Sequence, residues 1–145
     1  MKVDWTTDSA GVMRGFNYHD SGLVGLEWAE TRYLRIRLLS PNGISTVELT
    51  DLEVVTLREV WDGAIVSEIF AWPISAVPET VWDMSDGAWH VLLSWRTRQS
   101  DERLAAAQIT KRRPSGLLVQ VLTSYGGAIA AVCENINVST ENSAG

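Results

Sequence analysis

Reactive side chains are scarce in this 145-residue chain, which contains one cysteine and two histidines. The single cysteine, Cys133, cannot form an internal disulfide, so the fold must be held by packing, which suits a reducing compartment. The sequence has no phosphate-binding loop, no nucleophile elbow and no spaced set of metal ligands. We therefore expect no cofactor and no bound metal.

Long apolar runs are also missing. No run approaches the ~20 apolar residues that span a bilayer. Asp4 and Asp8 fall where a signal peptide would carry an apolar stretch. These absences predict a cytoplasmic protein with no membrane partner.

Positive charge is in short supply, because 12 lysines and arginines face 18 aspartates and glutamates, which gives a net charge of −6. Nucleic-acid binding requires a cationic footprint that neutralises phosphates. The only cationic clusters are short ones within 32–37 and 111–113, and such clusters are typical of a solvated surface. We therefore expect no nucleic-acid partner.

The remaining composition is ordinary for a globular protein, with 46% hydrophobic and 21% charged residues. The length matches the commonest size of a single domain. No linker or repeat divides the chain, and a polar segment closes it. We predict one domain at 1–138 and a disordered tail at 139–145.

Alternation of apolar and polar residues predicts most of the secondary structure. Residues 33–40 alternate cleanly, and the turn Pro41-Asn42-Gly43 leads back into an antiparallel partner at 44–49. The apolar phase slips after Leu49, which indicates a bulge or corner at 50–51. Further strands are expected at 24–28, 53–60, 64–72, 89–95, 117–123 and 128–138.

Helix signals are fewer. Residues 100–113 have Ser100 as a possible cap, acidic residues at the start and cations at the end. A second, short helix is expected to start at Pro78. Together these patterns predict an α+β fold, mainly an antiparallel sheet of six or more strands with one or two short helices packed on it.

Seven tryptophans are many for this length. Each large ring can fill a core, act as a hot spot of a protein interface or stack on a sugar ring. We assign four or five of them to the core, including Trp89 and Trp95. Trp5, Trp61 and Trp72 lie near turns or ends and are predicted to be exposed. Exposed rings along one groove would favour a carbohydrate- or small-ligand-binding module.

The stretch Tyr18-His19-Asp20-Ser21 contains the residue types of a hydrolase triad. Adjacent residues cannot adopt the triad geometry, in which the histidine lies between the nucleophile and the acid. A turn that starts the strand at 24–28 is the favoured role, through backbone bonds accepted by Asp20 or Ser21. A hydrolase or metal enzyme centred on His19 and Asp20 stays an alternative, and it requires His90 or Cys133 close by.

Three further residues are candidates for partner contacts. Arg35 and Arg37 lie on the polar face of the strand at 33–40, and Tyr125 lies in a glycine-rich turn. The strand at 64–72, which Pro73 ends or places at an edge, could pair with a second copy in a homodimer.

Two segments resemble a group of small, β-rich bacterial domains. They are Tyr18-His19-Asp20-Ser21 with the strand residues after it, and Ser124-Tyr125-Gly126-Gly127 followed by Val132-Cys133-Glu134. Some members of that group are classed with the immunity proteins that bacteria use against the toxins of their neighbours. The resemblance implies a cytoplasmic, non-enzymatic protein that neutralises a toxin by binding it, and it supplies no catalytic residues. The acidic charge suits such a role where the toxin has a basic cleft.

Overall fold

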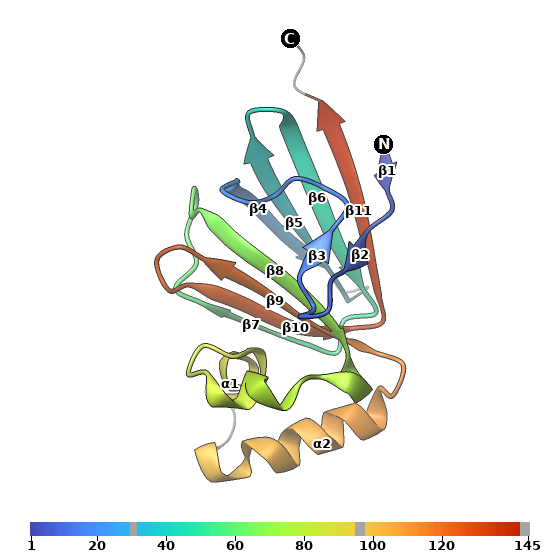
Figure 1. Ribbon diagram of the computed structural model, residues 1–145, viewed down its shortest axis with the longest axis vertical. Coiled ribbons are helices and arrows are strands. Elements are labelled where there is room, and N and C mark those ends of the chain that lie inside the picture. The colour runs from blue at the N-terminus through green and yellow to red at the C-terminus, as the bar shows by residue number, and fades with distance from the viewer. Residues whose placement is uncertain (30–31, 95–97, 143–145) are drawn as a thin grey trace.

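The computed structural model describes residues 1–29, 32–94 and 98–142, and it places two antiparallel sheets and a helical layer one above another (Figure 1). The strands are β1 (Lys2–Val3), β2 (Thr6–Thr7), β3 (Met13–Arg14), β4 (Gly22–Ala29), β5 (Tyr33–Ser40), β6 (Gly43–Thr50), β7 (Val54–Arg58), β8 (Val66–Pro73), β9 (Leu117–Thr123), β10 (Ala128–Cys133) and β11 (Asn135–Asn142). The helices are α1 (Ala88–Leu93) and α2 (Glu102–Arg112), with short 3-10 segments η1 (Ile74–Ala76), η2 (Glu79–Asp83) and η3 (Gln99–Asp101).

The first sheet has the strand order β1-β11-β6-β5-β4, and the second has the order β7-β10-β9-β8. A small third sheet pairs β2 with β3. The chain passes between the two large sheets at one corner, where β6 of the first sheet leads into β7 of the second and β10 of the second leads into β11 of the first. At this corner the Glu134 N–H donates to the Thr50 carbonyl at 3.1 Å. The predicted α+β class is confirmed, and the corner lies where the apolar phase slips.

The core between the two sheets comes from the alternating strands. On β5, Leu34, Ile36 and Leu38 are almost fully buried, whereas Arg35 and Arg37 lie on the opposite face. Each such buried aliphatic side chain contributes roughly 1.5 to 3 kcal/mol relative to exposure. β5 pairs with β6 in the hairpin that the sequence predicts.

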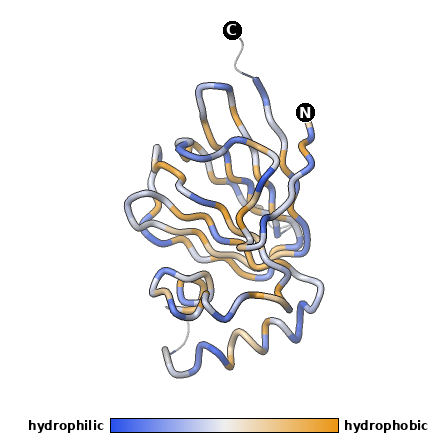
Figure 2. Tube along the Cα trace, viewed as in Figure 1, coloured by the Kyte–Doolittle hydropathy of each residue, from blue (hydrophilic) through white to orange (hydrophobic). Residues whose placement is uncertain are grey.

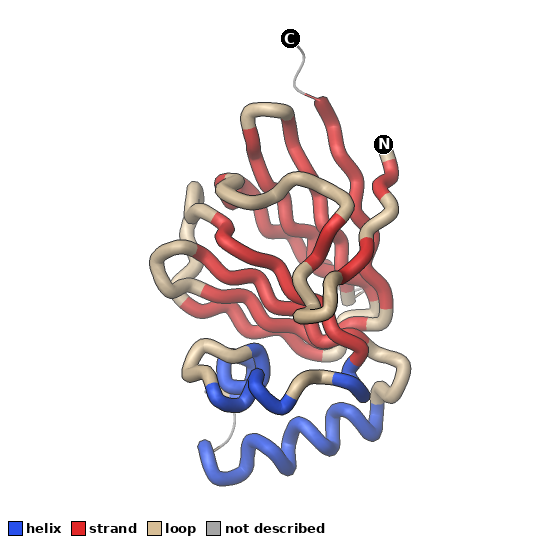
Figure 3. The backbone as a smooth tube through the Cα atoms, viewed as in Figure 1, coloured by secondary structure: helices blue, strands red, loops and turns tan. Residues whose placement is uncertain are grey.

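Helices cover the other face of the second sheet (Figure 3). Trp72 from β8 and Leu118 from β9 belong to this second apolar cluster, together with Trp89 and Leu92 from α1. Figure 2 shows how apolar residues run along the strands of both sheets. The second sheet is therefore buried on both faces, and the first sheet keeps one face open to solvent.

The strand predicted at 89–95 is wrong, because this segment contains the helix α1. Trp89, Val91 and Leu93 are buried, as alternation requires, but Ala88 and Leu92, on the other parity, are buried too. A short helix enclosed by the second sheet and α2 buries nearly all of its residues, which removes the helical periodicity from the sequence. Trp95 lies outside the described residues.

The helix predicted at 100–113 is confirmed as α2, although it starts at Glu102 and Ser100 does not cap it. Its end is tied to the corner of the sheets, where Arg112 and Arg113 form ion pairs with Glu53 at 3.0 and 3.3 Å. Burial alone would raise the pKa of the Glu53 carboxyl, but the two arginines outweigh burial and hold that pKa below its usual value. The cations at 111–113 therefore serve partly to anchor the helix.

The disordered tail predicted from residue 139 is corrected for residues 139–142. These residues continue β11, which pairs with β6 as far as Asn142 opposite Gly43. On its other side, Ser139 pairs with Lys2 of β1. Polar composition suggested fraying, but pairing with a strand on each side supplies backbone bonds that composition does not reveal.

The N-terminal segment covers the edge of β8. Val12 forms a bridge with Phe70, and the Ala71 N–H donates to the Gly11 carbonyl at 2.9 Å. The indole N–H of Trp72 donates to the Ala10 carbonyl at 3.1 Å. The edge that the sequence offered for a homodimer is therefore occupied by the chain itself. No helix within the described residues is long and apolar enough to cross a membrane.

We predict that stability falls in alkaline solution partly through Cys133, which lies in the core between the sheets. Burial raises the pKa of this thiol to about 12. The thiol therefore stabilises the fold fully below about pH 9, where it is protonated in both states, and this contribution is lost as the pH rises towards 12. Urea unfolding from pH 8 to 11 should show a slope that Cys133→Ala reduces by up to about 1.4 kcal/mol per pH unit. Equal slopes in the two proteins would contradict the prediction.

Candidate functional site

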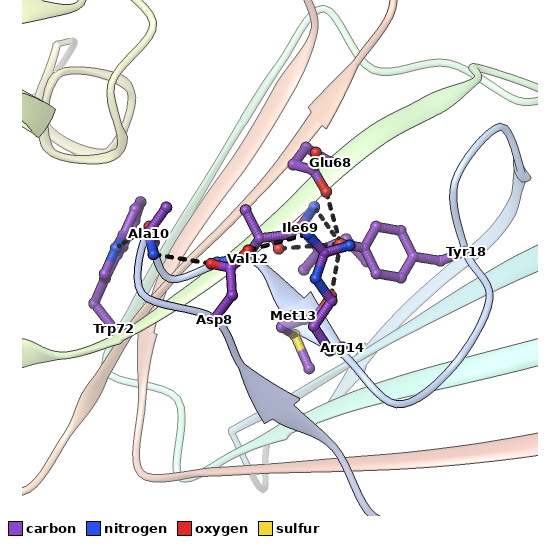
Figure 4. A network of polar contacts seen from close by, with 9 residues as sticks. All are labelled: Asp8, Ala10, Val12, Met13, Arg14, Tyr18, Glu68, Ile69 and Trp72. Carbon is purple, nitrogen blue, oxygen red and sulfur yellow. Dashed lines mark hydrogen bonds and ion pairs between the residues drawn. The ribbon is translucent and has the colours of Figure 1, made fainter.

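The motif Tyr18-His19-Asp20-Ser21 has a largely structural role. The Tyr18 hydroxyl is buried and lies 2.8 Å from a Glu68 carboxylate oxygen and 3.0 Å from the Met13 carbonyl oxygen (Figure 4). Burial, reinforced by the Glu68 carboxylate, raises the pKa of this phenol. The Ser21 N–H donates to the Tyr18 carbonyl at 2.9 Å, which closes the turn before β4. The expected turn is therefore present, but backbone groups form it.

His19 and Asp20 are exposed on this turn. The side chain of His19 is 64% exposed and donates from Nδ1 to the Ser67 carbonyl at 2.6 Å. Its Nε2 lies 3.8 Å from Asp20. Neither His90 nor Cys133 joins them, because His90 is bound in the helical layer and Cys133 is in the core. In the part of the chain that the structure describes, no group of three or more His, Cys, Asp or Glu side chains is placed to hold a metal ion.

The tryptophans divide differently from the prediction. Trp72 was expected at the surface but is only 6% exposed, because the N-terminal segment and the helical layer enclose its ring. Trp5 is half-buried and donates from its indole to the Ile136 carbonyl at 2.9 Å. Trp61 is exposed, as predicted. Trp28, which the sequence did not single out, is 62% exposed at the end of the edge strand β4.

Two of the predicted residues meet at one end of the molecule. Trp61, in the loop between β7 and β8, and Tyr125, in the turn between β9 and β10, have ring centroids 6.3 Å apart. The planes of the rings are tilted by 33°. Both side chains are exposed, Trp61 by 47% and Tyr125 by 71%. We call this pair, with the neighbouring Val24, the aromatic end.

Backbone bonds fix the loops that carry the aromatic end. The Gly63 N–H donates to the Leu23 carbonyl at 2.7 Å, and the Ser124 N–H donates to the Ile65 carbonyl at 2.9 Å. Gly126 adopts a φ of +87° in the turn that carries Tyr125, a conformation that glycine adopts without strain. The rings therefore project from anchored turns, and little entropy is lost when they bind.

An apolar hollow of about 360 Å³ lies beside Trp61. It is lined by Leu23, Val24, Gly25, Leu26, Val60, Trp61 and Asp62. Val24 is 42% exposed here, and Leu39, opposite Gly22 on the neighbouring strand, is 49% exposed. The aromatic end thus extends into an apolar surface that the described residues leave uncovered.

Next to it lies the open face of the first sheet, which carries the two predicted arginines. Arg35 bonds to Glu48 at 2.8 Å and to Glu27 at 2.9 Å, and it lies over the ring of Tyr33. The stem of Arg37 packs over Gly25 of β4, where it would contact any added side chain. Among the described residues, Arg37 has no acidic partner within ion-pair distance.

The geometry therefore brings two sequence candidates, Trp61 and Tyr125, together, and places Arg35 and Arg37 on the open face of the first sheet. His19 and Asp20 flank the aromatic end, because His19 bonds to Ser67 and the Asp20 N–H donates to the Val66 carbonyl at 2.9 Å, just after the loop that carries Trp61. The sequence missed Val24, and its position on an alternating strand gave no signal of exposure. No family model, curated protein or solved structure matches this chain, so the interpretation of this surface rests on its geometry.

Proposed function

We propose that this protein is a non-catalytic binding domain, similar in role to an immunity protein, that neutralises a protein toxin in the cytoplasm by docking it on the aromatic end. The observation that carries the proposal is the exposed pair of Trp61 and Tyr125 on anchored turns. Tryptophan and tyrosine are the side chains most enriched at the energetic centres of protein interfaces.

The surroundings of the pair support an interface of the usual construction. Val24 lines the same hollow as Trp61, and the exposed Leu39 and the charged face with Arg35 and Arg37 belong to the neighbouring strand β5. Stable interfaces combine an apolar centre with a polar rim that stays partly wet. The ion pairs of Arg35 hold its guanidinium in place before a partner arrives.

Two alternatives were open from the sequence. An enzyme centred on His19 and Asp20 lacks support, because His19 is bound to a backbone carbonyl and, among the described residues, neither His90 nor Cys133 joins it. The carbohydrate-binding hypothesis requires exposed aromatic rings in one place, and Trp61 and Tyr125 meet that requirement. However, the tilt of 33° leaves no common plane, so one sugar ring would stack on only one of them.

The proposal predicts that a double variant, Trp61→Ala with Tyr125→Ala, loses its partner. Proteins retained from the source cells by the immobilised wild type would be identified, purified and measured by calorimetry. We expect the double variant to bind at least ~100-fold more weakly, since each hot-spot ring contributes about 2 kcal/mol or more. Trp28→Ala is the matched control, because Trp28 is also exposed, by 62%, but it lines a different hollow from Trp61.

A second readout tests the role in immunity. Expression of the retained partner alone should arrest growth, and co-expression of the wild type should restore it, whereas the double variant should not. A partner that is harmless, or that binds the double variant with unchanged affinity, would overturn the proposal. Retention of a polysaccharide instead of a protein would favour the carbohydrate-binding alternative.

A further inference from the structure

We infer that the aromatic end receives a cationic side chain, arginine or lysine, from a basic segment of its protein partner. The inference rests on the proposed function and adds the chemistry of the partner. It starts from the charges around the two rings. Asp62 follows Trp61 directly and lines the same hollow, Glu59 precedes it in the same loop, and Asp20 lies in the adjoining turn.

These carboxylates are not neutralised by the chain itself. Across residues 1–29, 32–94 and 98–142, neither Asp62 nor Glu59 has a lysine or arginine within ion-pair distance, and both are exposed. Asp20, 75% exposed, has only His19 nearby, at 3.8 Å. By contrast, Glu27, Glu48, Glu53, Glu79 and Glu134 each have an arginine partner. The loops beside the rings therefore carry free negative charge.

The rings reinforce this preference. The face of an aromatic ring attracts a cation that lies within about 6 Å of its centroid, and tryptophan attracts it best. The described residues include such contacts, with Arg35 at 4.9 Å from the centroid of Tyr33 and Arg103 at 4.6 Å from that of Trp82. Within the described residues, no arginine or lysine side chain lies over the ring of Trp61 or Tyr125. Their exposed faces are open to a cation from outside.

The neighbouring hollow suits the rest of such a side chain. Its lining of Leu23, Val24, Leu26 and Val60 is apolar, whereas Asp62 is charged at its rim. Arginine and lysine side chains match this arrangement, because each has an apolar stem and a charged head group. The net charge of −6 would steer a basic partner towards the molecule and disfavour an acidic one.

The test uses a peptide of four arginine–glycine repeats, added to the 15N-labelled protein. The indole resonance of Trp61 is assigned by its loss in Trp61→Phe. We expect the peptide to shift this resonance with saturation, and we expect the affinity to fall at least threefold in Asp62→Asn and in Tyr125→Leu. Trp28→Phe should bind like the wild type. A matched peptide with glutamate in place of arginine should leave the resonance unchanged.

Absence of a shift, equal affinity in Asp62→Asn and Tyr125→Leu, or an equal response to the glutamate peptide would overturn the inference. Circular dichroism of both variants confirms that they are folded. Failure of the inference and failure of the proposed function are separable. A toxin that needs Trp61 and Tyr125 but binds Asp62→Asn unchanged would sustain the docking role and exclude the cation. Binding of the arginine peptide at Trp61 without any toxin partner would sustain the cation site and exclude the immunity role.

Discussion

Replacing Gly11 with alanine is expected to lower the free energy of unfolding by about 2 to 5 kcal/mol. Gly11 has a φ of +88°, which strains any residue with a Cβ. A Cβ at this position would also overlap the indole of Trp72. The ring cannot withdraw easily, because it stacks on Phe70 and its N–H donates to the Ala10 carbonyl. The change would separate the N-terminal segment from the edge of β8.

Gly63→Ala is the matched control for Gly11→Ala. Gly63 has a similar φ of +82°, but nothing lies within 4 Å of a Cβ placed there. This variant should lose only the backbone term, about 1 to 2 kcal/mol. Urea unfolding of both variants isolates the contact with Trp72. Equal losses would mean that the indole moves aside at no cost, and the N-terminal segment would then not depend on this packing.

Replacing Glu102 with alanine is expected to lower the free energy of unfolding by about 1 to 3 kcal/mol, because a buried ring nitrogen loses its hydrogen-bond partner. The Glu102 side chain is 5% exposed and lies 2.5 Å from Nδ1 of His90. The other ring nitrogen of His90 lies 2.9 Å from the Trp82 carbonyl oxygen. The two contacts occupy both nitrogens of the His90 ring. Without Glu102, Nδ1 of His90 would be left in the helical layer without its hydrogen-bond partner.

Two comparisons test this account of Glu102. Glu79 pairs with Arg103 at the surface with 73% of its side chain exposed, and Glu79→Ala should cost at most about 1 kcal/mol. A double variant, His90→Leu with Glu102→Leu, removes both polar partners and should recover much of the loss, because no buried polar group is then left unpaired. Chemical unfolding of the set measures both differences. If Glu102→Ala is no more costly than Glu79→Ala, the buried pair does not hold α1 to α2.

Local patterns were sufficient for most strands and insufficient for the helical layer. The hairpin of β5 and β6 follows from alternation because one of its faces is buried and the other is wet. Residues 128–138 looked like one strand, but the chain turns at Glu134 and divides it between two sheets as β10 and β11. The segment at 88–93 is buried on all sides, so no periodicity remained to identify a helix.

Local sequence patterns were also insufficient to predict how the residues of the candidate site come together. Trp61 and Tyr125 were each predicted as surface contacts, but their meeting depends on two turns separated by more than 60 positions in the sequence. The prediction that Trp72 is exposed was wrong because the segment that covers it lies 62 positions earlier in the sequence. Alternation of apolar and polar residues distinguishes the two faces of a strand. It cannot show that a segment distant in the sequence covers a residue on one of those faces.

The position of β11 has a consequence for how the protein is made. It is the last strand along the chain, yet it lies inside the first sheet, between β1 and β6. β10, made just before it, lies inside the second sheet between β7 and β9. During synthesis, neither sheet can close until these residues leave the ribosome. The earlier hairpins can pair, but both sheets stay incomplete until β10 and β11 are made, and contacts so distant along the chain form slowly. A nascent chain stalled before residue 128 would therefore expose both halves of its future core.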